Sequence, residues 1–122
     1  MKFIDNNSEA NYKEFNFQLH NTNFYGQLFQ PEKIEAVLLA VHGMGEHSGR
    51  YGGHFAKAFN DKNIAVVSYD QFGHGKTEGK RGHTPSYDAN LDCIYKMLAE
   101  IQGYYGDEIS VFLYGHSMGG NL

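Results

Sequence analysis

Three short runs of apolar residues dominate the hydrophobic pattern, and each has the length of a strand. They span residues 36–41, 64–69 and 109–114, and they are rich in aliphatic and aromatic side chains. Apolar runs with little polar alternation are typical of strands that are buried on both faces of a parallel sheet. We therefore predict three buried parallel strands at the centre of the fold.

Two segments between these runs repeat their apolar residues at the period of a helix. Residues 51–62 carry them at positions 51, 55, 58 and 59, and residues 86–102 at positions 87, 91, 94, 98 and 101. Spacings of three and four residues place side chains on one face of a helix. The second helix is predicted to face the sheet through this stripe, with Cys93 lying off it as an inert thiol.

The first third of the chain predicts a β-hairpin. Residues 14–20 and 23–30 read as two strands joined by a short turn at Asn21-Thr22. Residues 1–13 are expected to be disordered or frayed, and residues 14–122 to form part of one domain. The element order is then an antiparallel hairpin followed by parallel β-α-β-α-β, which indicates an α/β fold.

Composition narrows the choice of function classes. The chain has 10 basic and 14 acidic residues, a net charge of −4 and scattered lysines and arginines, which argues against nucleic acid as a partner. It shows neither a secretory signal nor the roughly 18 apolar residues of a membrane span. The single Cys93 excludes an internal disulfide and favours a reducing compartment, so we expect a cytoplasmic protein.

Residues able to carry chemistry follow the ends of all three predicted parallel strands. His42-Gly43 follows the first strand, Asp70 the second and the stretch around Ser117 the third. The carboxyl ends of parallel strands meet at one edge of a sheet, and ligands bind at that edge. The convergence therefore predicts a functional site there.

Gly115-His116-Ser117-Met118-Gly119 has the G-x-S-x-G pattern of a nucleophile elbow. In such an elbow a serine sits on a strained turn between a strand and a helix, and glycines are needed where the chain folds against itself. The apolar strand before the pattern fits this reading and predicts Ser117 as a nucleophile. A serine in an ordinary glycine-rich turn is the alternative.

The stretch from His42 to Gly45 is a glycine-rich turn at a strand end, suited to an oxyanion hole. A serine hydrolase needs two N–H donors, one after the nucleophile and one from a loop after another strand. These donors are predicted to be the backbone N–H groups of Met118 and Met44, facing the Ser117 hydroxyl. An ordinary strand-to-helix turn is the alternative.

The remaining patterns are weaker evidence for a function. Gly73-His74-Gly75-Lys76-Thr77 suggests a phosphate loop, but Asp70 stands where such a loop needs glycine. Asp70 also precedes Ser117, the wrong order for a triad acid, so it is expected to bond loop N–H groups. The seven histidines lack metal-ligand spacing, and His74 and His83 are expected to lie in a flexible loop. We predict no metal and no cofactor.

Taken together, three motifs resemble the monoacylglycerol lipase and lysophospholipase branch of the α/β-hydrolase family, which includes serine aminopeptidase-like enzymes. They are residues 42–51 (HGMGEHSGRY), 69–75 (YDQFGHG) and 115–120 (GHSMGG). The resemblance implies that Ser117 is the nucleophile, that Met44 and Met118 supply the oxyanion hole, and that His42, Gly43, Gly45, Gly115 and Gly119 support them. It also places the strand at 37–41 between those at 64–69 and 109–114.

Family members are more than twice as long, so the resemblance implies the N-terminal half of an α/β-hydrolase fold, truncated just after the nucleophile elbow. The triad acid, the catalytic histidine and the cap are expected beyond Leu122. One hypothesis is a serine esterase that cleaves lipid-like acylglycerol or lysophospholipid esters. The other is a non-catalytic or split fragment that acts only through self-association or a partner, such as its own C-terminal half.

Overall fold

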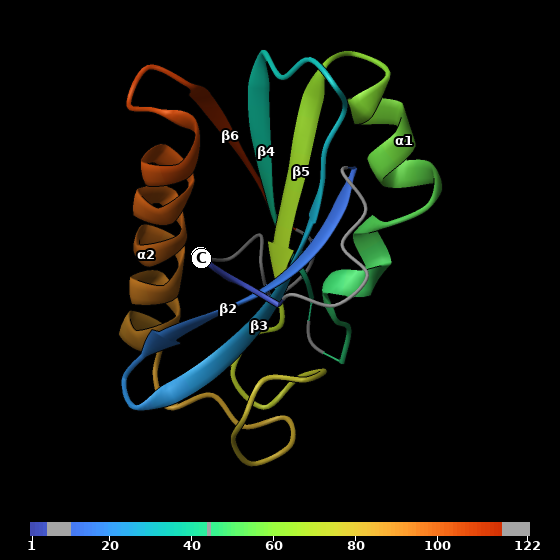
Figure 1. Ribbon diagram of the computed structural model, residues 1–122. Helices are drawn as coiled ribbons and strands as arrows, with labels where there is room; N and C mark the ends of the chain where they lie inside the picture. The colour runs from blue at the N-terminus through green and yellow to red at the C-terminus, as the bar shows by residue number, and fades with distance from the viewer. Residues whose placement is uncertain (5–10, 44, 116–122) are drawn as a thin grey trace.

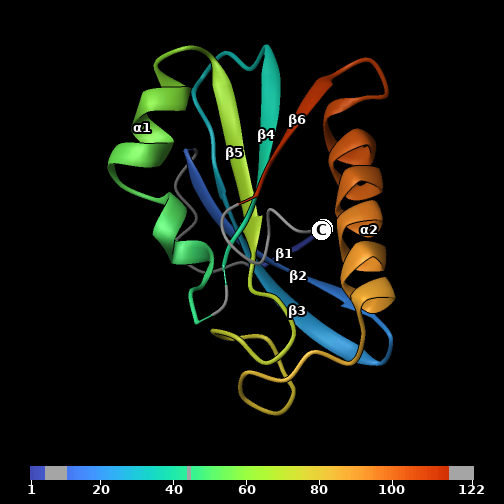
Figure 2. The same ribbon diagram turned by 180° about the vertical axis from the view of Figure 1, so that it is seen from behind.

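The computed structural model describes residues 1–4, 11–43 and 45–115, which form one mixed sheet flanked by helices on both faces (Figures 1 and 2). The spatial strand order is β1-β2-β3-β5-β4-β6. The strands are β1 (Lys2–Phe3), β2 (Tyr12–Leu19), β3 (Thr22–Phe29), β4 (Ala36–Val41), β5 (Ile64–Tyr69) and β6 (Ser110–Gly115).

The three predicted parallel strands are confirmed, each to within one residue. β4 pairs in parallel with β5 on one side and with β6 on the other. The predicted neighbours of the 37–41 strand are therefore also confirmed. Because β4 is central, all six of its side chains are buried, as its uninterrupted apolar run indicates.

The predicted hairpin is confirmed, but its turn lies one residue earlier. β2 and β3 pair from Tyr12 with Phe29 to Leu19 with Thr22, so His20 and Asn21 form the turn. Both turn residues have positive φ angles, 50° and 56°. Two such residues make the tight turn whose twist matches that of a hairpin, and His and Asn tolerate the left-handed region better than Thr.

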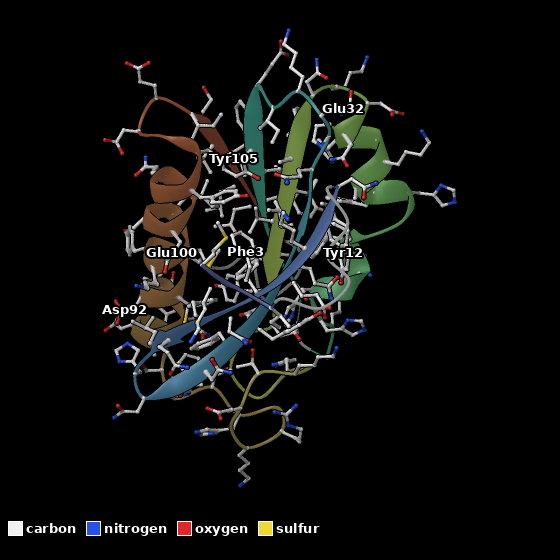
Figure 3. All side chains as sticks on the ribbon, viewed as in Figure 1. Phe3, Tyr12, Glu32, Asp92, Glu100 and Tyr105 are labelled. Atoms are coloured by element: carbon white, nitrogen blue, oxygen red, sulfur yellow. The ribbon has the colours of Figure 1, made fainter. Side chains whose placement is uncertain are left out.

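Residues 1–4 and 11–13, the described parts of the segment expected to be frayed, include strand residues, and residues 5–10 lie outside the described residues. Lys2–Phe3 form β1, which pairs with β2 beside Asn16 and Phe15, and β2 itself begins at Tyr12. The ammonium of Met1 lies 2.6 Å from a carboxylate oxygen of Glu100 on the last helix. Figure 3 shows Phe3 and Glu100 where β1 runs toward that helix. The ion pair and the strand pairing hold this end against the sheet.

The single helix predicted over residues 51–62 is wrong in its boundaries. A short 3-10 helix η1 (Ser48–Tyr51) is followed by the α-helix α1 (His54–Asn60). Gly52 and Gly53 separate them, and Gly53 has φ 57° and ψ −127°, a conformation that side chains disfavour. The apolar spacing continues across the break, which is why periodicity alone joins the two segments.

The second helix, α2 (Tyr87–Tyr105), begins after Ser86, whose hydroxyl accepts a hydrogen bond from the Ala89 N–H at 3.0 Å. Its predicted sheet-facing stripe is partly wrong, because Tyr87 is exposed and Cys93 is buried. The predicted stripe and the set of buried residues both have helical spacing, and they share Ile94 and Ile101. Only packing against the sheet decides which set faces inward.

The core has two layers, one on each face of the sheet. Successive residues of a strand point to opposite faces, so a strand covered on both faces is apolar at nearly every position, as β4 and β5 are. The larger cluster lies between the sheet and α2 and includes Leu39, Val67 and Met97. The smaller cluster lies on the α1 side and includes Ala40 and Val66. β4 and β5 are therefore buried between the two clusters.

Candidate functional site

The carboxyl ends of the three parallel strands lie at one edge of the sheet. Val41, the last residue of β4, pairs with Gly115, the last residue of β6. His42 follows Val41 directly, and Gly115 begins the G-x-S-x-G pattern. The His42 turn and the start of the serine motif therefore leave the sheet side by side. Ser117, Met118, Gly119 and Met44 lie outside the described residues, and their roles remain predictions.

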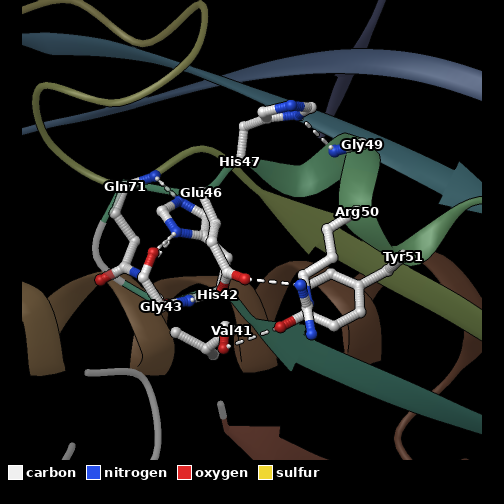
Figure 4. A network of polar contacts seen from close by, with 9 residues as sticks. All are labelled: Val41, His42, Gly43, Glu46, His47, Gly49, Arg50, Tyr51 and Gln71. Carbon is white, nitrogen blue, oxygen red and sulfur yellow. Dashed lines mark hydrogen bonds and ion pairs between the residues drawn. The ribbon is translucent and has the colours of Figure 1, made fainter. Parts of the chain in front are cut away.

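His42 is buried at the end of β4, where it supports the turn rather than facing solvent. Its Nδ1 lies 2.7 Å from the Gly43 carbonyl oxygen, and its Nε2 accepts the Gln71 N–H at 3.0 Å. Burial lowers the pKa of His42, so the ring is neutral near pH 7. His42 thus joins the loops after β4 and β5, as Figure 4 shows.

The N–H groups of Gly43 and Gly45, which flank residue 44, are both engaged. Gly43 donates to Glu46 Oε1 at 2.6 Å, and Gly45 donates to His74 Nε2 at 3.1 Å. Glu46 returns a bond from its own N–H to the Gly43 carbonyl at 3.1 Å. These bonds fix the peptides on either side of the position predicted to donate to an oxyanion.

Asp70 organises the loop after β5, as the sequence predicts. Its carboxylate accepts the Ser48 N–H at 2.6 Å and the Lys76 N–H at 2.8 Å. A side chain at Gly75 would place a Cβ 2.2 Å from Asp70 Oδ2, so the loop can wrap the carboxylate only with glycine there. With its oxygens turned to backbone donors, Asp70 has a structural role.

The loop containing His74 is more ordered than the sequence suggests. His74 is buried, its Nδ1 lies 2.8 Å from the Phe72 carbonyl oxygen, and its ring centroid is 5.0 Å from that of His42. The expectation of a flexible position is therefore wrong for His74. His83, which is expected to lie in the same flexible loop, is exposed.

An ion pair closes the other side of the turn. Arg50 Nη1 lies 2.6 Å from Glu46 Oε2, so the carboxylate bonds the turn with one oxygen and the guanidinium with the other. The Tyr51 hydroxyl donates to the Val41 carbonyl at 3.3 Å, and burial raises the pKa of Tyr51 to about 12. Figure 4 shows these contacts around the end of β4.

Sequence reasoning missed the parts played by Glu46, Gln71 and His74. Glu46 had a local signal, because a carboxylate three residues after a glycine in a turn can reach back to its N–H. Gln71 and His74 had none beyond their place after a strand, since their partners lie 29 residues away. Contacts of that range depend on the pairing of β4 with β5.

Two cavities lie among the described residues, and one of them is partly lined by the loop after β5, through Phe72 and His83. One of about 480 Å³ lies between the β2–β3 turn and the start of α2, and one of about 500 Å³ lies beside β1. None of the predicted site residues that the structure describes lines either of them. Within ranges 1–4, 11–43 and 45–115, no cluster of three or more His, Cys, Asp or Glu side chains could hold a metal ion.

Comparison with known protein families decides to which family the chain belongs. The hydrolase family described as serine aminopeptidase S33 matches residues 32–122. The chain belongs to this α/β-hydrolase family. The match includes the His42 turn, the Asp70 loop and the G-x-S-x-G pattern, and the mixed sheet with its helices agrees with the fold of solved α/β-hydrolases.

Relatives of this chain include named lipases. The chain is 32% identical over 107 residues to the monoglyceride lipase homolog of Monkeypox virus, covering 87% of this chain and 38% of that protein. It is 35% identical over 88 residues to the monoglyceride lipase of Mus musculus, covering 72% of this chain and 28% of that protein. The chain thus spans well under half the length of these relatives.

A solved thermostable carboxyl esterase from Bacillus coagulans superposes on this chain with a TM-score of 0.78 and 29% identity, covering 91% of this chain and 38% of that structure. The shared part corresponds to the N-terminal portion of the α/β-hydrolase fold. Neither α1 nor α2, the α-helices of the described ranges, is long and apolar enough to cross a membrane.

Proposed function

We propose that this chain carries the nucleophile and the oxyanion hole of a serine hydrolase that cleaves carboxylic esters of the monoacylglycerol or lysophospholipid type. Ser117 is the nucleophile, and the N–H groups of Met44 and Met118 bind the oxyanion. His42, Gly43, Gly45, Gly115 and Gly119 support these three residues. The names of the relatives support the ester class.

One observation carries the proposal: β4 and β6 end side by side. The pairing of Val41 with Gly115 brings the start of the glycine-rich turn next to the start of the serine motif. The N–H groups on both sides of residue 44 already have acceptors, Glu46 and His74. A turn fixed on both sides suits a donor that must be preorganised for a developing negative charge.

The proposed reaction proceeds through an acyl-enzyme. Ser117 Oγ bonds to the ester carbonyl carbon while its proton passes to a histidine base, and the two donors bind the resulting oxyanion. Collapse of this intermediate breaks the bond to the alcohol, which takes the proton from the base. Water then attacks the acyl group with help from the same base and releases the carboxylic acid.

The base and the triad acid lie beyond residues 1–122 in this proposal. His42 and His74 each use both ring nitrogens in loop contacts, and His20 pairs with Asp92 at 2.9 Å. Without a base a serine hydroxyl is a weak nucleophile at neutral pH. Residues 1–122 alone are therefore expected to be inactive or nearly so.

A second candidate function is favoured by one feature, the uncovered strand β6. Its Phe112, Leu113 and Tyr114 are 55%, 56% and 38% exposed. A strand edge with apolar side chains recruits another strand or aggregates. In this reading residues 1–122 are a non-catalytic fragment that acts only by associating with a partner, with another copy or with the C-terminal half of the enzyme.

Hydrolysis of p-nitrophenyl butyrate tests the first function, with residues 1–122 compared with a longer protein that contains them. The longer protein should turn over the ester, and Ser117→Ala should lower kcat by roughly 10⁴-fold or more. Ser110→Ala, at the exposed start of the same strand, is the matched control and should retain activity.

If residues 1–122 alone turn over the ester and Ser117→Ala abolishes that turnover, the proposal that the catalytic base lies outside residues 1–122 is wrong. A longer protein that remains inactive would favour the fragment function. The cytoplasmic location stays a prediction, which imaging of a tagged protein in its own cell would test.

A further inference from the structure

Two histidines from neighbouring loops bind each other's loops. His42, after β4, accepts the N–H of Gln71, which follows β5, at 3.0 Å. His74, after β5, accepts the N–H of Gly45, which follows β4, at 3.1 Å. Both side chains are buried and their rings are 5.0 Å apart. We call this reciprocal arrangement the histidine clasp.

The contacts fix the tautomer of each ring. A carbonyl oxygen can only accept a hydrogen bond, so His74 Nδ1 carries the proton that faces Phe72 at 2.8 Å. A backbone N–H can only donate, so His74 Nε2 must be unprotonated where it meets Gly45. At His42 the backbone N–H of Gln71 likewise requires an unprotonated Nε2. Each ring therefore accepts a hydrogen bond at Nε2 and donates at Nδ1.

We propose that His74 is a positioning residue of the oxyanion-binding loop, acting through the N–H of Gly45. The inference rests on the proposed function, because it needs the neighbouring Met44 N–H to be the oxyanion donor. Glu46 holds the Gly43 N–H on the other side. Without the His74 acceptor, the glycine-rich turn is held only on the Gly43 side. The proposed Met44 donor is then no longer preorganised.

The test compares two polar variants in the active protein that contains this chain. His74→Gln places an amide oxygen near the position of Nε2, whereas the shorter side chain of His74→Asn reaches only toward Phe72. His74→Asn should lower kcat about 10- to 100-fold with little change in KM, less than the 10²–10³-fold cost of deleting a donor. His74→Gln should recover most of kcat, and His83→Ala is the control for an exposed imidazole of the same loop.

Hydrogen exchange of the Gly45 amide, followed by NMR, gives a readout independent of turnover. The exchange rate should rise in His74→Asn and return toward the wild-type value in His74→Gln. Equal kcat and equal Gly45 exchange in the two variants, or a change confined to KM, would contradict the proposal that His74 positions this loop. Turnover that survives Ser117→Ala would instead refute the proposed function, which keeps the two failures apart.

Discussion

β4 and β6 are adjacent and parallel, and both are predicted from apolar runs, yet their environments differ. All six residues of β4 are buried, whereas five of the six residues of β6 are exposed and only Val111 is half-buried. β4 has β5 on one side and β6 on the other, but β6 has a paired neighbour only on the β4 side among the described residues. An apolar run therefore predicts a strand, and its neighbours decide its burial.

Both faces of β6 are only partly covered. Val111 packs against the cluster under α2, and the Tyr114 ring lies 5.5 Å from that of Phe55 on α1. Leu113 and Phe112 are more than half exposed. The strand predicted to carry the nucleophile is thus the one with the least support among the three parallel strands of the described residues.

The largest expected contrast comes from truncating one leucine on each strand. Leu39→Ala removes a fully buried side chain on the central strand and should lower the free energy of unfolding by about 2–5 kcal/mol. Leu113→Ala, on the exposed strand, should cost less than about 1 kcal/mol. Urea titration of both variants measures the difference. Equal losses would mean that β6 is covered as well as β4.

A second contrast concerns two carboxylates, one that follows β5 and one that precedes β6. Asp70→Asn removes a buried charge that accepts two backbone N–H groups and should lower the free energy of unfolding by about 2–3 kcal/mol. Asp107→Asn, an exposed change before β6, should alter it by less than about 0.5 kcal/mol. The same titration applies, and a neutral Asp70→Asn would contradict the structural role of that carboxylate.

A pH dependence should come from the end of β4. Burial lowers the pKa of His42 below its unfolded value of about 6.5, so the folded state binds fewer protons. As pH falls through about 6.5 the unfolded state takes up a proton first. Stability should then decrease by up to about 1.4 kcal/mol per pH unit.

His42→Asn should remove this slope, which urea titrations at several pH values on either side of the unfolded pKa would reveal. His83→Ala, at an exposed imidazole, is the control and should keep the slope. A slope that is unchanged in His42→Asn would show that another group causes it.

The smallest expected effect is on the α1 side of β6. The Tyr114 ring lies 6.1 Å from that of Tyr51 and 5.5 Å from that of Phe55. Ring pairs of this kind contribute about 0.5–1.5 kcal/mol, so Tyr114→Ala should lower the free energy of unfolding by about 1 kcal/mol. Differential scanning calorimetry should register this as a fall in Tm of a few degrees. No fall would mean that these ring contacts do not stabilise β6.

The strands could be predicted from the sequence because apolar runs such as residues 36–41 and 64–69 are local signals. The break at Gly53 and the turn at His20 could not, because they depend on backbone conformations that periodicity does not encode. The strand ends of the site were predictable. The contact of Gly45 with His74 was not, since it forms only after β4 and β5 pair.

The central proposal is that residues 1–122 form part of a larger α/β-hydrolase-family domain, and that β6, the strand before the proposed nucleophile, lies at an open edge of the described residues. Analytical ultracentrifugation of this chain at micromolar concentration tests it most directly. The exposed apolar side chains of β6 predict self-association or aggregation. A sharp monomer peak near 13.8 kDa, with cooperative thermal unfolding, would contradict the account and show that the chain closes its own core.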